Sequence, residues 1–105
     1  MSNINYLNME KMFIIQLTYK ASLEQVDKYL VSYREFLDTG YRRNYFMASG
    51  PKKPRTGGII LSALKDKAQL EDFLKDDFLF IHGIAEYELI EFFPVKFHPD
   101  FERFI

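Results

Sequence analysis

Two hydrophobic periods alternate along this chain of 105 residues, and their order constrains the fold more than any other feature. From Phe13 to Tyr19 every second side chain is apolar, which indicates a strand with one buried face. From Leu23 to Leu37 the apolar side chains instead recur at spacings of three and four, which indicates an amphipathic helix. The chain repeats this change of period further on, so we expect a sheet and helices packed as two layers.

The first helix has a clear start and a clear end. Ser22 begins the segment SLEQ, a capping box in which the serine hydroxyl accepts a hydrogen bond from the backbone of Gln25. Gly40 and Asn44 can each take the left-handed conformation that ends a helix, so the helix is expected to end between them. Its apolar stripe, which we expect to face the sheet, consists of Leu23, Val26, Leu30, Tyr33 and Leu37.

The remaining chain supplies three more strands and a shorter helix. Gly50-Pro51 marks a turn, and residues 45–49 before it have the character of a strand. The elements expected after the loop that ends at Gly58 are a central strand at 59–64, a helix at 67–75, a turn at 76–83 and a last strand at 84–93. This β-α-β-β-α-β order predicts a ferredoxin-like α+β fold with a four-stranded antiparallel sheet and both helices on one face. We expect one domain at 12–105, preceded by a loose tail at 1–11.

Such a sheet leaves one face without helices. The side chains expected on that open face are Ile14, Gln16, Thr18, Glu86, Glu88, Ile90 and Phe92. This mixture is too apolar to be fully solvated, so we expect the face to join two copies as a homodimer with pockets between them. The aromatic, proline-interrupted residues 94–105 are expected to lie across a neighbouring surface.

The composition argues against several functional classes. Fourteen basic and fifteen acidic side chains leave a net charge of -1, so no overall field attracts nucleic acid or an anionic membrane. The absence of cysteine removes thiol catalysis, thiolate ligands and disulfides. The two histidines make a weak ligand set, so we expect neither a metal nor a cofactor. No stretch approaches the roughly 18 apolar residues of a membrane span, and we expect a cytoplasmic protein.

Short motifs in the middle of the chain carry a family resemblance. They are residues 33–41 (YREFLDTGY), 49–51 (SGP) and 54–58 (PRTGG), and Asp77 six residues before Gly83. In this order and spacing, residues 12–99 resemble the YciI-like (YCII-related) family. The resemblance implies a dimeric α/β barrel of ferredoxin-like protomers. It also implies an active site that pairs a histidine of the first helix with the aspartate of an Asp-Pro-Phe motif.

The chain departs from that family pattern at two positions. Asp77 matches the family aspartate, but Tyr33 stands where the histidine is expected, and Phe78 replaces the proline. A tyrosine with an ordinary pKa of about 10 is a much weaker base at pH 7 than a histidine with a pKa of about 6.5. The histidine–aspartate mechanism therefore does not transfer directly to this chain.

Tyr33 and Asp77 are the candidate catalytic residues, and each has a structural alternative. Tyr33 either donates a proton or hydrogen bond to a ligand, or fills the buried stripe of the helix. Asp77 either orients or accepts a proton, or caps the turn that begins at Phe78. His82, five positions after Asp77, either replaces the missing base or lies at the surface.

Ser49 and Arg55 are the candidate substrate-binding residues. Ser49 would line the mouth of a pocket between the first helix and the sheet. Arg55, together with Lys52 and Lys53, either holds a small acidic ligand or is solvated loop charge. Two hypotheses follow: a lyase or isomerase that transfers a proton on a small acidic or aromatic substrate, or a non-catalytic ligand-binding or interaction module.

Overall fold

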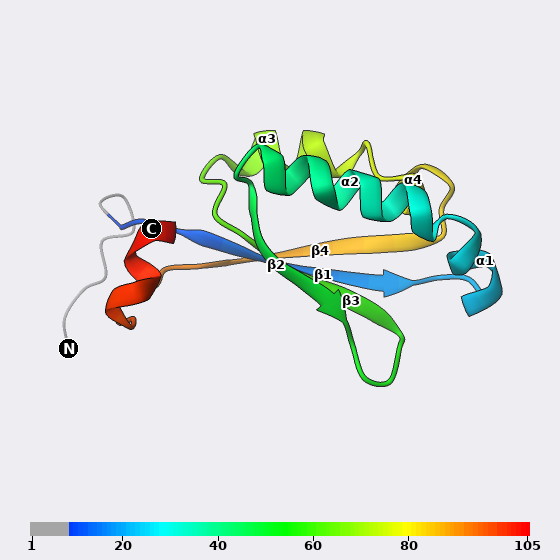
Figure 1. Cartoon of the computed structure of the whole chain (residues 1–105), viewed down its shortest axis with the longest axis horizontal. Helices are drawn as coiled ribbons and strands as arrows, with labels where there is room; N and C mark the ends of the chain where they lie inside the picture. The colour runs from blue at the N-terminus through cyan, green and yellow to red at the C-terminus, as the bar shows by residue number, and fades with distance from the viewer. Residues whose placement is uncertain (1–8) are drawn as a thin grey trace.

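The computed structural model describes residues 9–105, so the first eight residues of the tail expected at 1–11 lie outside the described range. The elements in chain order are β1 (Met12–Tyr19), α1 (Leu23–Lys28), α2 (Leu30–Arg42), β2 (Phe46–Pro51), β3 (Gly57–Ser62), α3 (Lys67–Leu74), α4 (Phe78–Ile81), β4 (Ala85–Phe92) and the 3-10 helix η2 (Pro99–Phe104). The strands form an antiparallel sheet in the order β2-β3-β1-β4. Helices α2, α3 and α4 lie on one face of it (Figure 1), which confirms the ferredoxin-like α+β fold.

The first helix is divided in two, which the sequence did not predict. Its start is as expected, because the backbone N–H of Gln25 donates to the Ser22 hydroxyl at 3.2 Å. At Tyr29 the backbone leaves the helical region, with φ -107° and ψ 8°. Its N–H donates to the carbonyl of Val26, three residues back, which closes α1 in a tight turn. The chain then continues as α2.

Gly40 and Asn44 have different roles at the end of α2. Asn44 has a φ of 60° and provides the left-handed residue that follows the helix. Gly40 lies inside α2, where it is buried against β2. A Cβ atom at Gly40 would lie 2.3 Å from the ring of Phe46, so only glycine lets the helix and the strand approach this closely.

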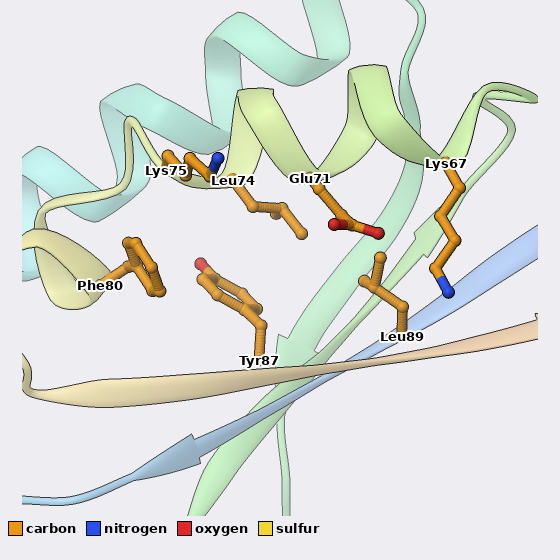
Figure 2. A pocket seen from close by; sticks show the side chains of 7 residues that line it. All are labelled: Lys67, Glu71, Leu74, Lys75, Phe80, Tyr87 and Leu89. Carbon is orange, nitrogen blue, oxygen red and sulfur yellow. The ribbon is translucent and has the colours of Figure 1, made fainter.

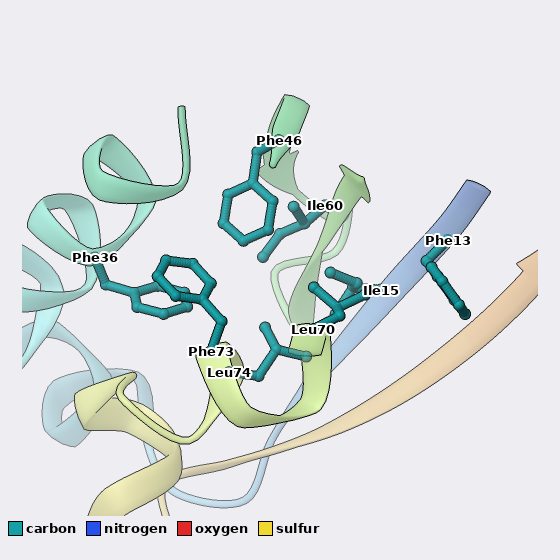
Figure 3. Packing of buried hydrophobic residues seen from close by; sticks show 8 residues of the cluster. All are labelled: Phe13, Ile15, Phe36, Phe46, Ile60, Leu70, Phe73 and Leu74. Atoms are coloured by element: carbon teal, nitrogen blue, oxygen red, sulfur yellow. The ribbon is translucent and has the colours of Figure 1, made fainter. Parts of the chain in front are cut away.

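The core between helices and sheet is built on stacked aromatic rings (Figure 3). The rings of Phe36 and Phe73 stack with centroids 4.8 Å apart, and Phe46 meets both rings edge-on. The buried residues of this cluster are Phe13, Ile15, Phe36, Phe46, Ile60, Leu70, Phe73 and Leu74. Aromatic pairs of this geometry add to the stabilisation gained from the burial of apolar area.

Strand β3 begins two residues earlier than the sequence suggested. Gly57 pairs with Thr18 and Gly58 pairs with Leu17, so both glycines belong to the strand. A Cβ atom at Gly57 would lie 1.8 Å from the carbonyl oxygen of Leu17. Gly57 therefore allows close backbone approach between β3 and β1, while a Cβ atom at Gly58 would lie 3.0 Å from the carbonyl oxygen of Gly50 in β2.

The open face of the sheet has the composition that alternation predicted. Ile14 pairs with Ile90 and Gln16 with Glu88, on the face opposite the helices. Strand β3 adds Leu61 to the same face, where this half-buried apolar side chain lies opposite Ile14. Within residues 9–105, no helix is long and apolar enough to cross a membrane.

The C-terminal segment lies beyond the end of the sheet, at the far left of Figure 1. Its 3-10 helix is capped by His98, whose Nδ1 accepts a hydrogen bond from the backbone of Asp100 at 3.1 Å. Phe104 and Ile105 face the start of β2 across a hollow that they share with Phe46. The end of the segment thus lies beside the start of β2, with this hollow between them.

Candidate functional site

A cavity of about 470 Å³ lies between the α1–α2 segment and the end of the sheet formed by β2 and β3. Its lining residues are Tyr19, Asp27, Leu30, Tyr33, Arg34, Leu37, Ser49, Gly50, Pro51, Arg55 and Gly58. Three of the four residues singled out from the sequence, Tyr33, Ser49 and Arg55, are among them. They come from α2, from β2 and from the β2–β3 loop, and the fold brings them together.

The cavity exists because large side chains on α2 lie opposite a part of β2 and β3 that has few side chains. Leu30, Tyr33 and Leu37 form a half-buried row on α2. Opposite them, Gly50 and Gly58 present only backbone. Of the stripe predicted to face the sheet, Val26 is fully buried, Leu23 is exposed, and these three residues line the cavity. The tight contact of α2 with the core is made instead by Phe36 and Gly40, which lie outside the predicted stripe.

The charged residues of the cavity leave a positive excess. Arg55 donates to the carboxylate of Asp27 at 2.7 Å, and this hydrogen bond raises the pKa of the Arg55 guanidinium. The same guanidinium lies 5.9 Å from the ring centroid of Tyr19. Arg34 has no salt-bridge partner in the part of the chain that the structure describes. Two guanidinium groups against one carboxylate make the cavity suited to an anion.

Ser49 is held in the wall of the cavity by a neighbouring tyrosine. Its hydroxyl lies 2.7 Å from the hydroxyl of Tyr41, and either oxygen can be the donor. One hydrogen of this pair remains free for a third group. Ser49 is thus positioned to bind a polar ligand atom.

Asp77 lies outside this cavity and is fully buried, with 0% of its surface exposed. It is the N-cap of α4, where its Oδ1 accepts from the backbone N–H of Leu79 at 3.1 Å. Its other oxygen, Oδ2, accepts a hydrogen bond from the hydroxyl of Tyr87 on β4. Burial raises the pKa of Asp77, and the hydrogen bonds from Tyr87 and from the backbone act against that rise. Both oxygens therefore have partners within the protein.

Tyr33 occupies a position between the cavity and the buried carboxylate. Burial raises the pKa of its hydroxyl well above the ordinary value, and the nearby charge of Asp77 raises it further. No hydrogen bond joins Tyr33 to Asp77 among the described residues. Tyr33 keeps its proton at neutral pH, so its hydroxyl can donate a hydrogen bond but cannot serve as a base.

The histidines take structural positions. The ring of His82 stacks on Tyr29 with centroids 4.5 Å apart and on Phe78 at 5.9 Å. His98 caps the C-terminal 3-10 helix. Over residues 9–105, no group of three or more histidine, aspartate or glutamate side chains is arranged to hold a metal ion.

The sequence did not single out four residues that shape the cavity and the surroundings of Asp77. Asp27 and Arg34 lie beside the apolar stripe, three or four positions from Leu30, a spacing that places them at its edge. Tyr19 and Tyr87 alternate onto the helix-facing side of β1 and β4. Only the alternation signalled these tyrosines, and it does not distinguish a lining residue from a core residue.

A scan against protein-family models and a search of curated proteins both find no match to this chain. The resemblance to the YciI-like family therefore stays a prediction that rests on the motifs.

The buried carboxylate predicts a specific dependence of stability on pH. Because burial disfavours ionised Asp77, the folded protein retains this proton to a higher pH than the unfolded chain, whose aspartates titrate near a pKa of about 3.9. Between that value and the raised folded pKa, the folded state binds more protons. The contribution of Asp77 to the free energy of unfolding is thus fully present below the unfolded pKa and is lost as pH rises through the folded pKa.

Urea unfolding of the wild type and of Asp77→Asn over a pH series measures this contribution. The asparagine can still cap α4 and bond to Tyr87 but has no charge. Relative to the wild type, the variant should gain stability as pH rises through the window and then reach a plateau. A difference that stays constant at every pH would contradict the assignment.

Proposed function

We propose that the protein binds a small organic acid in the cavity between α2 and the β2–β3 end of the sheet. The observation that carries this proposal is the convergence of Tyr33, Ser49 and Arg55 on one cavity of about 470 Å³. A volume of this size is ordinary for a small-molecule site. The ligand carboxylate would meet Arg55 and Arg34, while its apolar part would contact Leu30 and Leu37.

Asp27 competes with such a ligand for Arg55. The ion pair between them is partly exposed, with 34% and 51% of the two side chains accessible, so its net stabilisation is small. A ligand carboxylate can contact Arg34 and the Tyr33 hydroxyl in addition to Arg55. These additional contacts favour the ligand over Asp27 as the partner of the Arg55 guanidinium. Binding would then replace the Asp27 contact.

This competition makes opposite predictions for two substitutions. With benzoate as the probe in isothermal titration calorimetry, Arg55→Gln should weaken binding about tenfold, which is the loss of one charge-assisted hydrogen bond. Asp27→Asn should strengthen binding, because it removes the competitor. Lys53→Gln, in the same loop but outside the cavity lining, is the matched control and should have no effect. Equal responses of Arg55→Gln and Lys53→Gln would refute the assignment of the site.

Proton-transfer chemistry of the lyase or isomerase type is a second candidate function. The observation in its favour is that the Tyr33 hydroxyl lines the cavity and lies close enough to Asp77 for that charge to affect its pKa. Tyr33 would donate a hydrogen bond to the substrate, and the negative charge of Asp77 behind it would keep Tyr33 in its protonated, donating form.

Turnover of unsaturated and halogenated cyclic acids, followed by NMR, tests this candidate. Any activity should be lost in both Tyr33→Phe and Asp77→Asn, and Tyr33→His should raise the rate by restoring a base near neutral pH. Ligand binding with no turnover, even in Tyr33→His, would leave the non-catalytic binding module as the function.

We also propose that the protein is a cytoplasmic member of the YciI-like family and forms a homodimer through the open sheet face. The motifs and the ferredoxin-like fold support the membership. The half-buried apolar row on the open face, which includes Ile14, Ile59 and Leu61, supports the dimer, since every copy offers the same face to its partner.

Analytical ultracentrifugation tests the dimer. Leu61→Lys places a charge in the centre of the open face and should shift the protein to a monomer. Val31→Lys is the control, because Val31 is 68% exposed on α2, on the helical side of the molecule. A wild type that sediments as a monomer, or a Leu61→Lys variant that stays dimeric, would rule out this interface.

A further inference from the structure

A second hollow of about 330 Å³ lies between α3, α4 and β4 (Figure 2). Its lining residues are Lys67, Glu71, Leu74, Lys75, Phe80, Tyr87 and Leu89. It shares no lining residue with the cavity described above. Leu74, Leu89 and the rings of Phe80 and Tyr87 give it apolar walls, so it can receive an apolar group.

The polar groups around this hollow have unused hydrogen-bonding capacity of both kinds. The hydroxyl of Tyr87 donates its hydrogen bond to Asp77, so towards the hollow the Tyr87 oxygen can only accept a hydrogen bond. Glu71 is a second acceptor, and within residues 9–105 it has no salt-bridge partner. Lys67 is a cation that likewise lacks such a partner in that range. Lys75 pairs with Asp72 at 3.5 Å, and both side chains are largely exposed.

These groups lie in an order that fits a ligand with two opposite charges. Figure 2 shows the hydroxyl of Tyr87 and the amine of Lys75 on one side, the carboxylate of Glu71 directed into the middle and the amine of Lys67 at the other side. A simple anion would meet Glu71, and a simple cation would meet Lys67, so either one leaves a repulsive contact. A zwitterion satisfies both charges.

We propose that this hollow binds a free α-amino acid with an apolar or aromatic side chain. The ammonium group of the ligand donates to Glu71. The carboxylate meets Lys67, and the side chain packs between Leu74, Phe80 and Leu89. This second site is independent of the acid-binding cavity proposed above, and the two can be tested separately.

L-Tryptophan is a suitable probe, because the chain contains no tryptophan and excitation beyond the absorption band of its tyrosines gives fluorescence from the ligand alone. Its fluorescence anisotropy should rise with protein concentration and saturate, with a Kd of about 1 mM or below. Glu71→Gln and Lys67→Gln should each weaken binding about fivefold, the upper range for one exposed charge pair. Both positions are exposed on α3, so neither substitution threatens folding.

Two analogues assign each charge to its partner. N-Acetyltryptophan lacks the cation and tryptamine lacks the carboxylate, and both should bind the wild type more weakly than tryptophan. Glu71→Gln should abolish the preference for tryptophan over N-acetyltryptophan, and Lys67→Gln should abolish the preference over tryptamine. Arg55→Gln, in the other cavity, should change none of these affinities.

Three results would each overturn the proposal. The first is an anisotropy that does not saturate at about 10 mM protein or ligand. The second is equal affinity of the wild type for tryptophan and both analogues. The third is a loss of tryptophan binding in Arg55→Gln, which would place the ligand in the first cavity.

Discussion

The burial of one carboxylate fixes how helix α4 meets strand β4. An ionisable group without solvent contact is stable in a protein only when its oxygens have partners, and Asp77 obtains them from the Leu79 backbone and from Tyr87. These two bonds tie the start of α4 to β4. They also hold Leu79 in the small core cluster with Leu17, against which Tyr33 packs. The walls of both cavities therefore depend on this one buried group.

Most of the fold could be predicted because its signals are local. The alternation in β1 fixes its two faces, and the capping box at Ser22 fixes the start of α1. The break at Tyr29 could not be predicted, because the apolar spacing continues through it without a glycine or a proline. The early start of β3 was missed for the opposite reason, because Gly57 and Gly58 are present there and glycine is unfavourable in strands unless a neighbouring backbone requires it.

The sequence predicted three of the residues that line the candidate cavity but also placed Asp77 with them. The separation of Asp77 from the other three has a physical cause. Tyr33, Ser49 and Arg55 meet because α2 crosses the sheet above the end of β2, which the element order implies. Asp77 lies apart from them because its partner Tyr87 comes from β4, ten residues along the chain. A contact between a hydroxyl and a carboxylate at that separation depends on how α4 folds back on the strand, and no periodicity encodes it.

The edges of the sheet limit how copies of this chain can associate. At one edge, β2 carries a register irregularity between Phe46 and Ala48 and ends at Pro51, which lacks a backbone donor. At the other edge, β4 carries the exposed glutamates Glu86, Glu88 and Glu91. Incoming strands would meet a distorted backbone on one side and charged side chains on the other, where Glu86 pairs with Lys20 and Glu91 with Lys11. These features oppose growth into an extended sheet, so association through the open face, as proposed above, would end at a closed particle.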